Sequence, residues 1–147
     1  MPEDVFSILK DKFTGISLEA QTQCIIVESG ELKKVCLFLK EDLGFEYLAN
    51  LAAIDYKDKF AIVYVLYSFK SKNKLSLKVF LDASKPSIES IADIFRAADW
   101  HEREAYDLMG INFAAHPDLR RILWPDDWQG HPLRKDYQKE GMIRLPQ

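Results

Sequence analysis

The chain has 147 residues, 48% of them hydrophobic and 29% charged, and its formal net charge is −3. That length is enough for one domain with its own core, and the composition is that of a folded protein rather than a disordered one. The slightly acidic balance argues against nucleic-acid binding, and two cysteines, Cys24 and Cys36, are too few to hold an iron–sulfur cluster.

The apolar segments are short. The longest mostly apolar run, residues 60–69, has half of the roughly 20 residues that a bilayer-spanning helix needs. The first residues, Met1-Pro-Glu-Asp4, are acidic and lack the basic start and apolar core of a signal peptide. We therefore expect the chain on the cytoplasmic side, reaching a membrane only through partners.

The first 44 residues alternate between helical and strand patterns. Apolar residues at helical spacing predict helices over residues 3–13 and 32–43, and Gly15 and Gly44 follow them as terminators. The run Cys24-Ile-Ile-Val27 between the two helices is typical of a strand.

Three more strand-like runs follow, at residues 47–55, 61–69 and 75–81, with polar turns between them. Neighbouring strands joined by short turns pair in antiparallel fashion, and helices then cover the apolar face of the sheet. The sequence therefore predicts an α+β domain over residues 1–110, an antiparallel sheet with helices on one face.

A last helix is predicted from Ser87, a favourable N-cap, to Gly110, a favourable terminator. Glu102 lies on the apolar stripe of this helix, between Ala98 and Ala105. A buried carboxylate must be protonated or meet a cation. Either the helix exposes Glu102, or an arginine of the following segment binds Glu102 or Glu104, the candidates being Arg120, Arg121 and Arg134.

The remaining segment, residues 111–147, holds four of the six prolines, two of the three tryptophans and two of the three histidines. Proline removes a backbone donor and disfavours helix before it, so an extended, irregular path is expected. Such a path is stable only when it lies on another surface. We interpret it as a docking segment anchored by Trp124, Trp128 and Tyr137.

Patterns for catalysis are weak. The sequence His101-Glu-Arg-Glu-Ala105 begins like the HExxH zinc motif, but the second histidine position is alanine. His116 and His131 each precede proline, which favours imidazoles bonded to a local turn. A free-standing metal-dependent enzyme using His101, Glu104, His116 and His131 stays open as an alternative.

Three stretches of the C-terminal third carry a family resemblance. They are Glu102-Arg-Glu-Ala-Tyr-Asp-Leu-Met-Gly-Ile111, His116-Pro-Asp-Leu-Arg-Arg-Ile-Leu123 and Gly130-His-Pro-Leu-Arg-Lys-Asp-Tyr137. In this order and spacing they resemble the 30-kDa subunit of respiratory complex I, the type-1 NADH:quinone oxidoreductase.

The resemblance implies a structural subunit of the peripheral arm of a proton-translocating complex, on the cytoplasmic side of the cell membrane. It would dock on the 49-kDa quinone-site subunit, near subunits that carry iron–sulfur clusters. Catalytic, cofactor-binding and metal-binding residues are expected to be absent from this chain, while the complex would use FMN or another donor module, iron–sulfur clusters and quinone.

The residues that the resemblance assigns to docking and bracing lie in and after the last predicted helix. They are Glu102, Arg103, Glu104, Tyr106, Asp107, Gly110, His116, Pro117, Leu119, Arg120, Arg121, Trp124, Trp128, Gly130, His131, Pro132, Arg134, Lys135, Asp136 and Tyr137. Many members of the family continue further beyond the position of Tyr137. Short forms also resemble subunits of ferredoxin- or deazaflavin-linked relatives and of membrane-bound nickel–iron hydrogenases, so the electron donor is left open.

Overall fold

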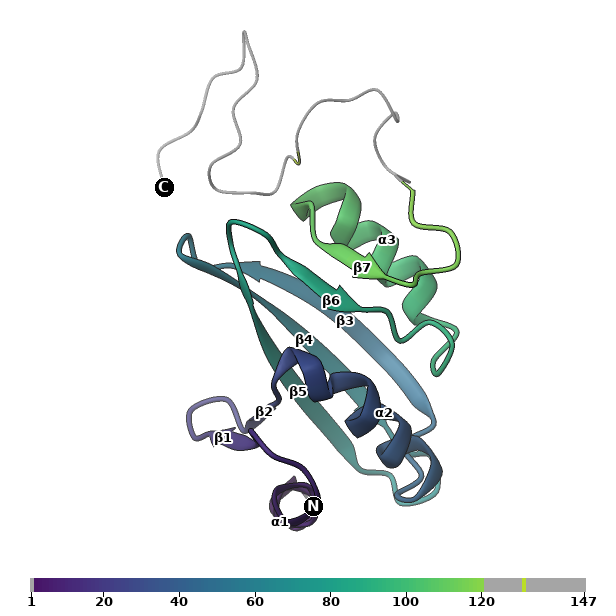
Figure 1. Ribbon diagram of the computed structural model, residues 1–147. Helices are drawn as coiled ribbons and strands as arrows, with labels where there is room; N and C mark the ends of the chain where they lie inside the picture. The colour runs from purple at the N-terminus through teal and green to yellow at the C-terminus, as the bar shows by residue number, and fades with distance from the viewer. Residues whose placement is uncertain (1, 121–130, 132–147) are drawn as a thin grey trace, which may run out of the picture.

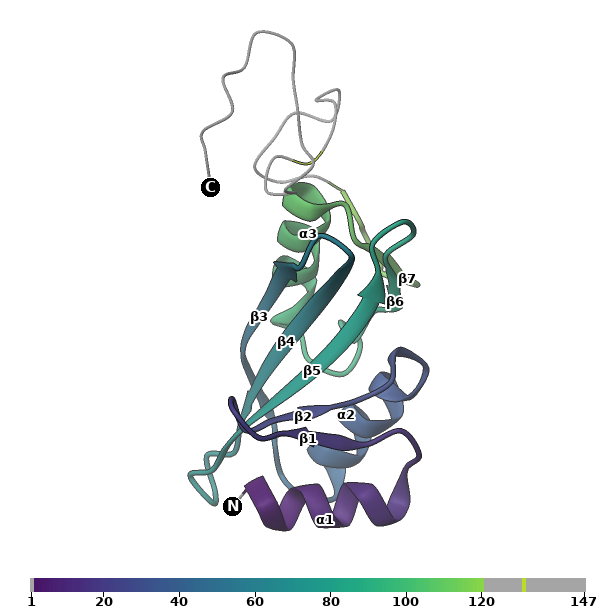
Figure 2. The ribbon, with the colours of Figure 1, turned by 90° about the vertical axis from the view of Figure 1, so that its left-hand side faces the viewer.

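The computed structural model describes residues 2–120 and residue 131, and its centre is a five-stranded sheet in the order β1-β2-β5-β4-β3 (Figures 1 and 2). The strands are β1 (Ser17–Glu19), β2 (Cys24–Ile26), β3 (Tyr47–Asp55), β4 (Lys59–Tyr67) and β5 (Lys74–Asp82). The helices are α1 (Pro2–Lys12), the 3-10 turn η1 (Ser29–Glu31), α2 (Leu32–Glu41) and α3 (Ala98–Met109). A second, two-stranded sheet joins β6 (Ser87–Glu89) to β7 (Asn112–Ala114).

The antiparallel meander β3-β4-β5 is the regular part of the sheet. On β4, Phe60, Ile62, Tyr64 and Leu66 are buried and lie at alternate positions, so they form one apolar face. Helices α2 and α3 lie on that face (Figures 1 and 2), and their buried residues join the same core. The predicted α+β fold with helices on one face of the sheet is confirmed.

In the five-stranded sheet, one strand pair departs from the antiparallel pattern. Strand β2 pairs with β5 in parallel, with Ile25 opposite Leu77. The reason lies in the connections: α2 carries the chain across the core to the far edge, where β3 begins, and two hairpins bring it back beside β2. After the crossover through α2, β3 runs in the same direction as β2. Each of the two hairpins reverses the strand direction, so β5 again runs parallel to β2.

The helix predicted from Ser87 begins later than expected. Ser87–Glu89 is strand β6, which pairs in parallel with β7 through Ile88 and Phe113, and α3 starts only at Ala98. The capping signal at Ser87 was therefore misleading, because pairing with a segment more than twenty residues away outweighs the weak local preference for a helix.

The other partner of that pairing, β7, follows Gly110. Ile111 is 0% exposed and Phe113 is 1% exposed, and both belong to the core that α3 and the large sheet share. The first residues of the predicted extended segment are thus part of the folded domain. Figure 1 shows β6 and β7 lying together beside α3.

Within the described residues, no helix is long and apolar enough to cross a membrane.

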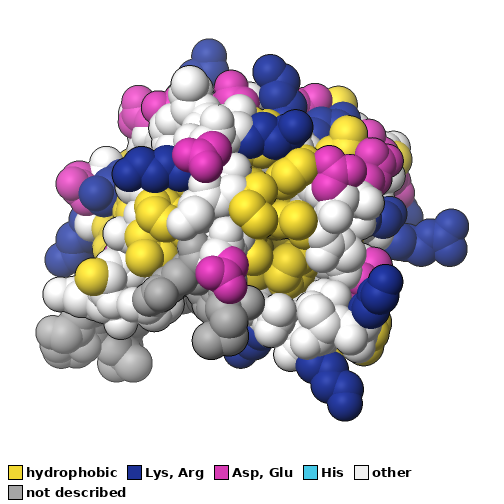
Figure 3. All heavy atoms as spheres, turned by 90° about the horizontal axis from the view of Figure 1, so that it is seen from below, with side chains coloured by type: hydrophobic (Ala, Val, Ile, Leu, Met, Phe, Trp, Pro, Cys, Tyr) yellow, Lys and Arg dark blue, Asp and Glu magenta, His cyan; other side chains and the backbone are white. Residues whose placement is uncertain are grey.

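Seen from the end at which α1 lies, hydrophobic side chains gather in the middle of the surface, flanked by basic and acidic ones (Figure 3). Large hydrophobic side chains that are exposed include Ile8 on α1 and Leu37 on α2.

Candidate functional site

Glu102 is the centre of a buried polar cluster on α3. Its side chain is 0% exposed, and both carboxylate oxygens accept a hydrogen bond: Ser90 Oγ donates to Oε1 at 2.5 Å and the backbone N–H of Ile91 donates to Oε2 at 2.9 Å. Ser90 and Ile91 lie just after β6, so Glu102 ties the β6–α3 connection to the middle of α3. The expectation that the helix might expose Glu102 is wrong.

The surroundings of Glu102 disfavour its charged form. Burial is the main cause that raises the pKa of Glu102 to about 7. The hydrogen bonds from Ser90 and Ile91 lower this pKa, while the negative charges of Asp99 and Asp93 raise it. Burial, together with the same carboxylate, raises the pKa of the Tyr64 hydroxyl on the facing strand. Glu102 is therefore poised to change its protonation state near neutral pH.

His116 closes the cluster from the segment after β7. Its Nδ1 accepts a hydrogen bond from the backbone N–H of Asp118 at 2.9 Å, so in the neutral ring the proton is on Nε2. Nε2 lies 3.2 Å from the backbone oxygen of Asp99, 3.2 Å from Asp99 Oδ1 and 3.7 Å from Glu102 Oε1. The prediction that this imidazole bonds a local turn is confirmed, and the ring also faces two carboxylates.

The basic group that meets Glu102 is thus a histidine and not an arginine, as far as the described residues go. Arg120 instead pairs with Asp118 at 3.0 Å, with both side chains exposed, so this candidate for the predicted arginine contact was wrong. The other two candidates, Arg121 and Arg134, lie outside the described residues. Arg103 bonds the backbone oxygen of Arg120 at 3.4 Å, which holds the end of the continuously described chain against α3.

The Glu102 cluster is one junction between α3 and a later part of the chain. A second junction lies at the C-terminal end of α3. His131 Nδ1 donates to the backbone oxygen of Asp107 at 3.0 Å, and its ring lies 5.9 Å from the ring of Tyr106. Asp107 is fully buried. The described partner of His131 is thus 24 residues away, while the predicted local turn falls on residues outside the described ones.

Gly110 makes room for His131. Its φ of 74° is a left-handed conformation that ends α3, and its backbone N–H bonds the oxygen of Tyr106. A Cβ at this position would lie 2.6 Å from His131 Cδ2, closer than real contacts. Glycine is therefore required here twice, for the turn and for the approach of the imidazole.

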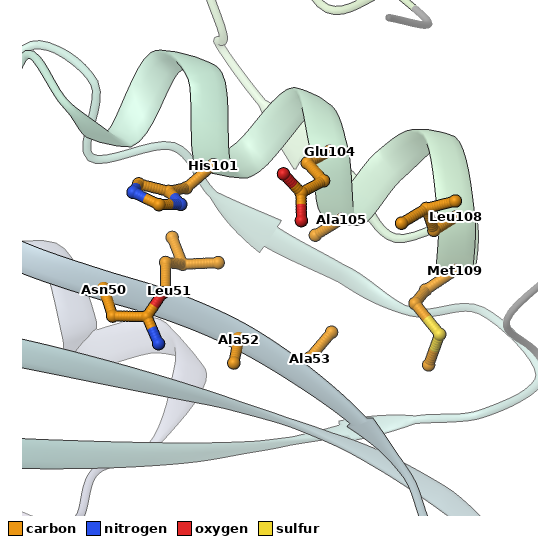
Figure 4. A pocket seen from close by; sticks show the side chains of 9 residues that line it. All are labelled: Asn50, Leu51, Ala52, Ala53, His101, Glu104, Ala105, Leu108 and Met109. Atoms are coloured by element: carbon orange, nitrogen blue, oxygen red, sulfur yellow. The ribbon is translucent and has the colours of Figure 1, made fainter. Parts of the chain in front are cut away.

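A cleft between α3 and β3 lies beside these junctions (Figure 4). Its volume is about 190 Å³, and His101 and Glu104 of α3 face the strand across it. The remaining lining residues are Asn50, Leu51, Ala52, Ala53, Ala105, Leu108 and Met109. The cleft is thus mostly apolar along β3, with one imidazole and one carboxylate on its helical wall.

The predicted docking residues separate into three groups. Glu102, Asp107, Gly110, His116 and His131 form the two junctions just described. On the surface around them lie Arg103, Glu104, Tyr106, Pro117, Leu119 and Arg120, which are exposed or partly buried. Outside the described residues lie Arg121, Trp124, Trp128, Gly130, Pro132, Arg134, Lys135, Asp136 and Tyr137.

Two residues of the cluster had no sequence signal. Ser90 and Asp99 contact the cluster through tertiary structure, and Ser90 was placed inside a helix that does not form there. The four residues of the metal-enzyme alternative are divided between the cleft, the buried cluster and the end of α3. Among residues 2–120 and 131, no three His, Cys, Asp or Glu side chains are grouped so that they could hold a metal ion.

Comparison with known proteins decides the family. The model of the family "Respiratory-chain NADH dehydrogenase, 30 Kd subunit" matches residues 25–142, most of the chain. The chain belongs to this 30-kDa subunit family. The match covers most of the sheet, α3 and nearly all of the C-terminal segment, so it includes all three motifs on which the resemblance rests.

Two relatives in the family match over most of this chain and most of their own length. The C subunit of the NADH-quinone oxidoreductase of Geotalea uraniireducens is 42% identical over 145 residues, which cover 94% of this chain and 88% of that protein. The C subunit of the same enzyme of Moorella thermoacetica is 45% identical over 121 residues, 80% of this chain and 82% of that one. The expectation of a complex I subunit is confirmed at the level of the family.

Two solved structures share the fold. A trypsin-resistant fragment of Nqo5 superposes with a TM-score of 0.69 at 28% identity, covering 81% of this chain and 100% of the fragment. A chain of the membrane-bound sulfane sulfur reductase, an archaeal respiratory membrane complex, gives a TM-score of 0.77 at 20% identity, over 92% of this chain and 85% of that one. The second likeness concerns the fold alone.

Proposed function

We propose that the chain is a structural subunit, without a redox centre, in the peripheral arm of a proton-translocating NADH:quinone oxidoreductase. Its C-terminal segment docks on the 49-kDa quinone-site subunit, on the cytoplasmic side of the cell membrane. The complex would supply the FMN or other donor module, the iron–sulfur clusters and the quinone site. This chain would fix the positions of neighbouring subunits, on whose spacing electron transfer depends.

The observation that carries the proposal is the pair of junctions on α3. Glu102 and His116 join the middle of the helix to the segment after β7, while Gly110 and His131 join its C-terminal end to a residue further along. A docking segment must leave its domain from a fixed place, because loose attachment would raise the entropic cost of binding. The two junctions supply that fixed place.

An alternative keeps the same role but changes the complex. The fold likeness to the archaeal sulfane sulfur reductase complex supports the equivalent subunit of a ferredoxin- or deazaflavin-linked relative or of a membrane-bound nickel–iron hydrogenase. A second alternative, a free-standing metal enzyme, is tested by metal analysis of the purified chain. Stoichiometric metal would favour it.

Co-purification distinguishes these proposals. An N-terminally tagged chain is expressed in its native host, membranes are solubilised gently, and the proteins that co-elute are identified by mass spectrometry. We expect a quinone-site subunit, cluster-bearing subunits and membrane subunits, together with an NADH-oxidising module. A hydrogenase or ferredoxin module would favour the alternative complex, and recovery of the chain alone from the soluble fraction would contradict both.

A further inference from the structure

The turn between β4 and β5 carries an exposed group of aromatic rings. Phe69 follows β4 and is 60% exposed, and Tyr47 at the start of β3 is 45% exposed. The ring of Phe69 lies 5.4 Å from that of Tyr47 and 5.2 Å from that of Tyr67. We call Tyr47, Tyr67 and Phe69 the aromatic corner. The β4–β5 turn projects from the end of the sheet opposite α3 and β7 (Figure 2).

The backbone of this turn is braced. The N–H of Phe69 donates to Glu46 Oε1 at 2.8 Å, and the N–H of Ser68 donates to the oxygen of Asn73 at 2.9 Å. The Ser68 hydroxyl, which is buried, accepts from the N–H of Ser71 at 3.3 Å. A large apolar side chain is thus held outward in a fixed position, which lowers the ordering cost of any contact it makes.

At the opposite end of the same sheet, lysine side chains lie over the rings of two other aromatic residues. There Tyr56 and Phe80 lie 6.3 Å apart, with Lys59 Nζ 4.4 Å from the centre of the Phe80 ring and Lys78 Nζ 5.4 Å from that of Tyr56. Among the described residues, no lysine or arginine lies over a ring of the aromatic corner. The corner therefore keeps apolar faces available that the other cluster hides.

The β4–β5 turn beside the corner is basic, although the acidic Glu46 lies next to Tyr47 and binds the N–H of Phe69. The turn Lys70-Ser-Lys-Asn-Lys74 has three lysines and no acidic residue, and all three lysines are exposed. The chain as a whole carries −3, so this local positive charge runs against the net charge. An apolar anchor beside a basic rim is complementary to an apolar socket beside carboxylates.

We propose that the aromatic corner is a second docking site, for a partner protein that presents an apolar socket rimmed by Asp or Glu side chains. Phe69 enters the socket, the two tyrosines pack around it, and Lys70, Lys72 and Lys74 meet the acidic rim. A fluid bilayer would not need the fixed geometry of the braced turn, whereas a protein socket does. This site is distinct from the junctions on α3 and extends the proposed function to a contact at the other end of the molecule.

Photo-crosslinking of the full-length chain in its native host tests the proposal. The photoreactive analogue benzoylphenylalanine replaces Phe69 in one version and, as the matched control, the exposed Tyr56 in another. We expect an adduct between position 69 and another protein, at a peptide flanked by Asp or Glu, and no adduct at this peptide from position 56. No adduct at position 69, an adduct with lipid, or an adduct with a second copy of the chain would each overturn the proposal.

Charge reversal tests the basic rim. With the photoreactive group at Tyr47, the change of Lys70→Glu together with Lys74→Glu should lower the adduct yield about tenfold, because like charges then face each other. The control pair Lys10→Glu and Lys34→Glu, exposed on α1 and α2, should leave the yield unchanged. Equal yields in both pairs would contradict an acidic rim.

The outcome separates this proposal from the proposed function. An adduct with a protein that belongs to no electron-transfer complex would count against the proposed function and leave the docking site standing. Co-purification of a complete complex in which position 69 forms no adduct would overturn the docking site and leave the proposed function standing.

Sedimentation with phosphatidylserine vesicles tests whether the aromatic corner binds a membrane instead of a protein. Vesicle binding that is lost in Phe69→Ser would show a membrane-binding surface and overturn the proposed protein socket.

Discussion

At the scale of the residue, Glu102 combines a structural and an electrostatic role. Its two oxygens hold the β6–α3 connection, while burial and the carboxylates of Asp99 and Asp93 make the charged form unfavourable. The imidazole of His116 faces it at 3.7 Å. The protonation of Glu102 therefore couples the packing of α3 to pH.

The sign of this coupling follows from the raised pKa. Because the folded state holds the proton of Glu102 up to about pH 7, above the ordinary pKa of 4.5, Glu102 favours the fold most below about 4.5 and this contribution is lost as pH rises to 7. A shift of this size corresponds to about 3 kcal/mol. We expect Glu102→Gln to flatten the fall in the free energy of unfolding between about pH 4.5 and about pH 7, measured by urea titration.

The matched control for this change is Glu104→Gln, two positions along α3, where the side chain is exposed. It should keep the pH dependence of the unmodified chain. If Glu102→Gln keeps the same pH dependence as Glu104→Gln, the carboxylate of Glu102 is already ionised in the folded state at low pH and the account of its burial is wrong.

Gly110 offers a second prediction at this scale. Gly44 has a similar φ of 77°, but a Cβ there would approach nothing closer than Ser68 Oγ at 3.8 Å. Gly44→Ala should therefore lower the free energy of unfolding by about 1–2 kcal/mol, the cost of placing alanine in the left-handed conformation. Gly110→Ala should cost about 1 kcal/mol more, because it displaces His131 from the Asp107 oxygen.

Thermal or urea unfolding of the two variants gives this difference. The excess at Gly110 should vanish in the background His131→Ala, which removes the imidazole that the new methyl group would meet. An excess that persists without the imidazole would show that the cost comes from the helix end itself and not from the junction with His131.

At the scale of the element, the sequence was informative where patterns were local. The strands of the meander followed from strand-like runs between polar turns, and α2 followed from its helical spacing and Gly44. The start of α3 was missed because Ser87 suits a helix N-cap and a strand position equally well, and its true partner, Asn112, is far along the chain. The partner of Glu102 was missed for the same reason, since Ser90 and His116 come together only in the folded structure.

The β6–β7 pair leads to a prediction about where the domain ends. A chain that stops after Gly110 loses Ile111 and Phe113 from the core, which should cost on the order of 4 kcal/mol in the free energy of unfolding. A chain that stops after Arg120 keeps every described helix and strand and should lose about 1 kcal/mol, from the His131 hydrogen bond. Urea unfolding of both compares them directly, and equal stabilities would mean that β7 is not part of the folding unit.

At the scale of the whole molecule, the fold holds the described residues after β7 against α3. The large sheet and α2 build the core, α3 lies over β3, and the two junctions on α3 set where the chain continues. The chain belongs to the 30-kDa subunit family, and both its role in positioning other subunits and its docking on the quinone-site subunit are what we propose.

The most direct test of that proposal compares the full-length chain with the chain that stops after Arg120, each tagged at the N-terminus and expressed in place of the native copy. Native gels of solubilised membranes measure incorporation into the complex, and circular dichroism of the purified chains checks that both are folded. We expect the shortened chain to fold but to be absent from the complex, while the full-length chain is present. Incorporation of the folded, shortened chain at the level of the full-length chain would contradict the docking role of the C-terminal segment.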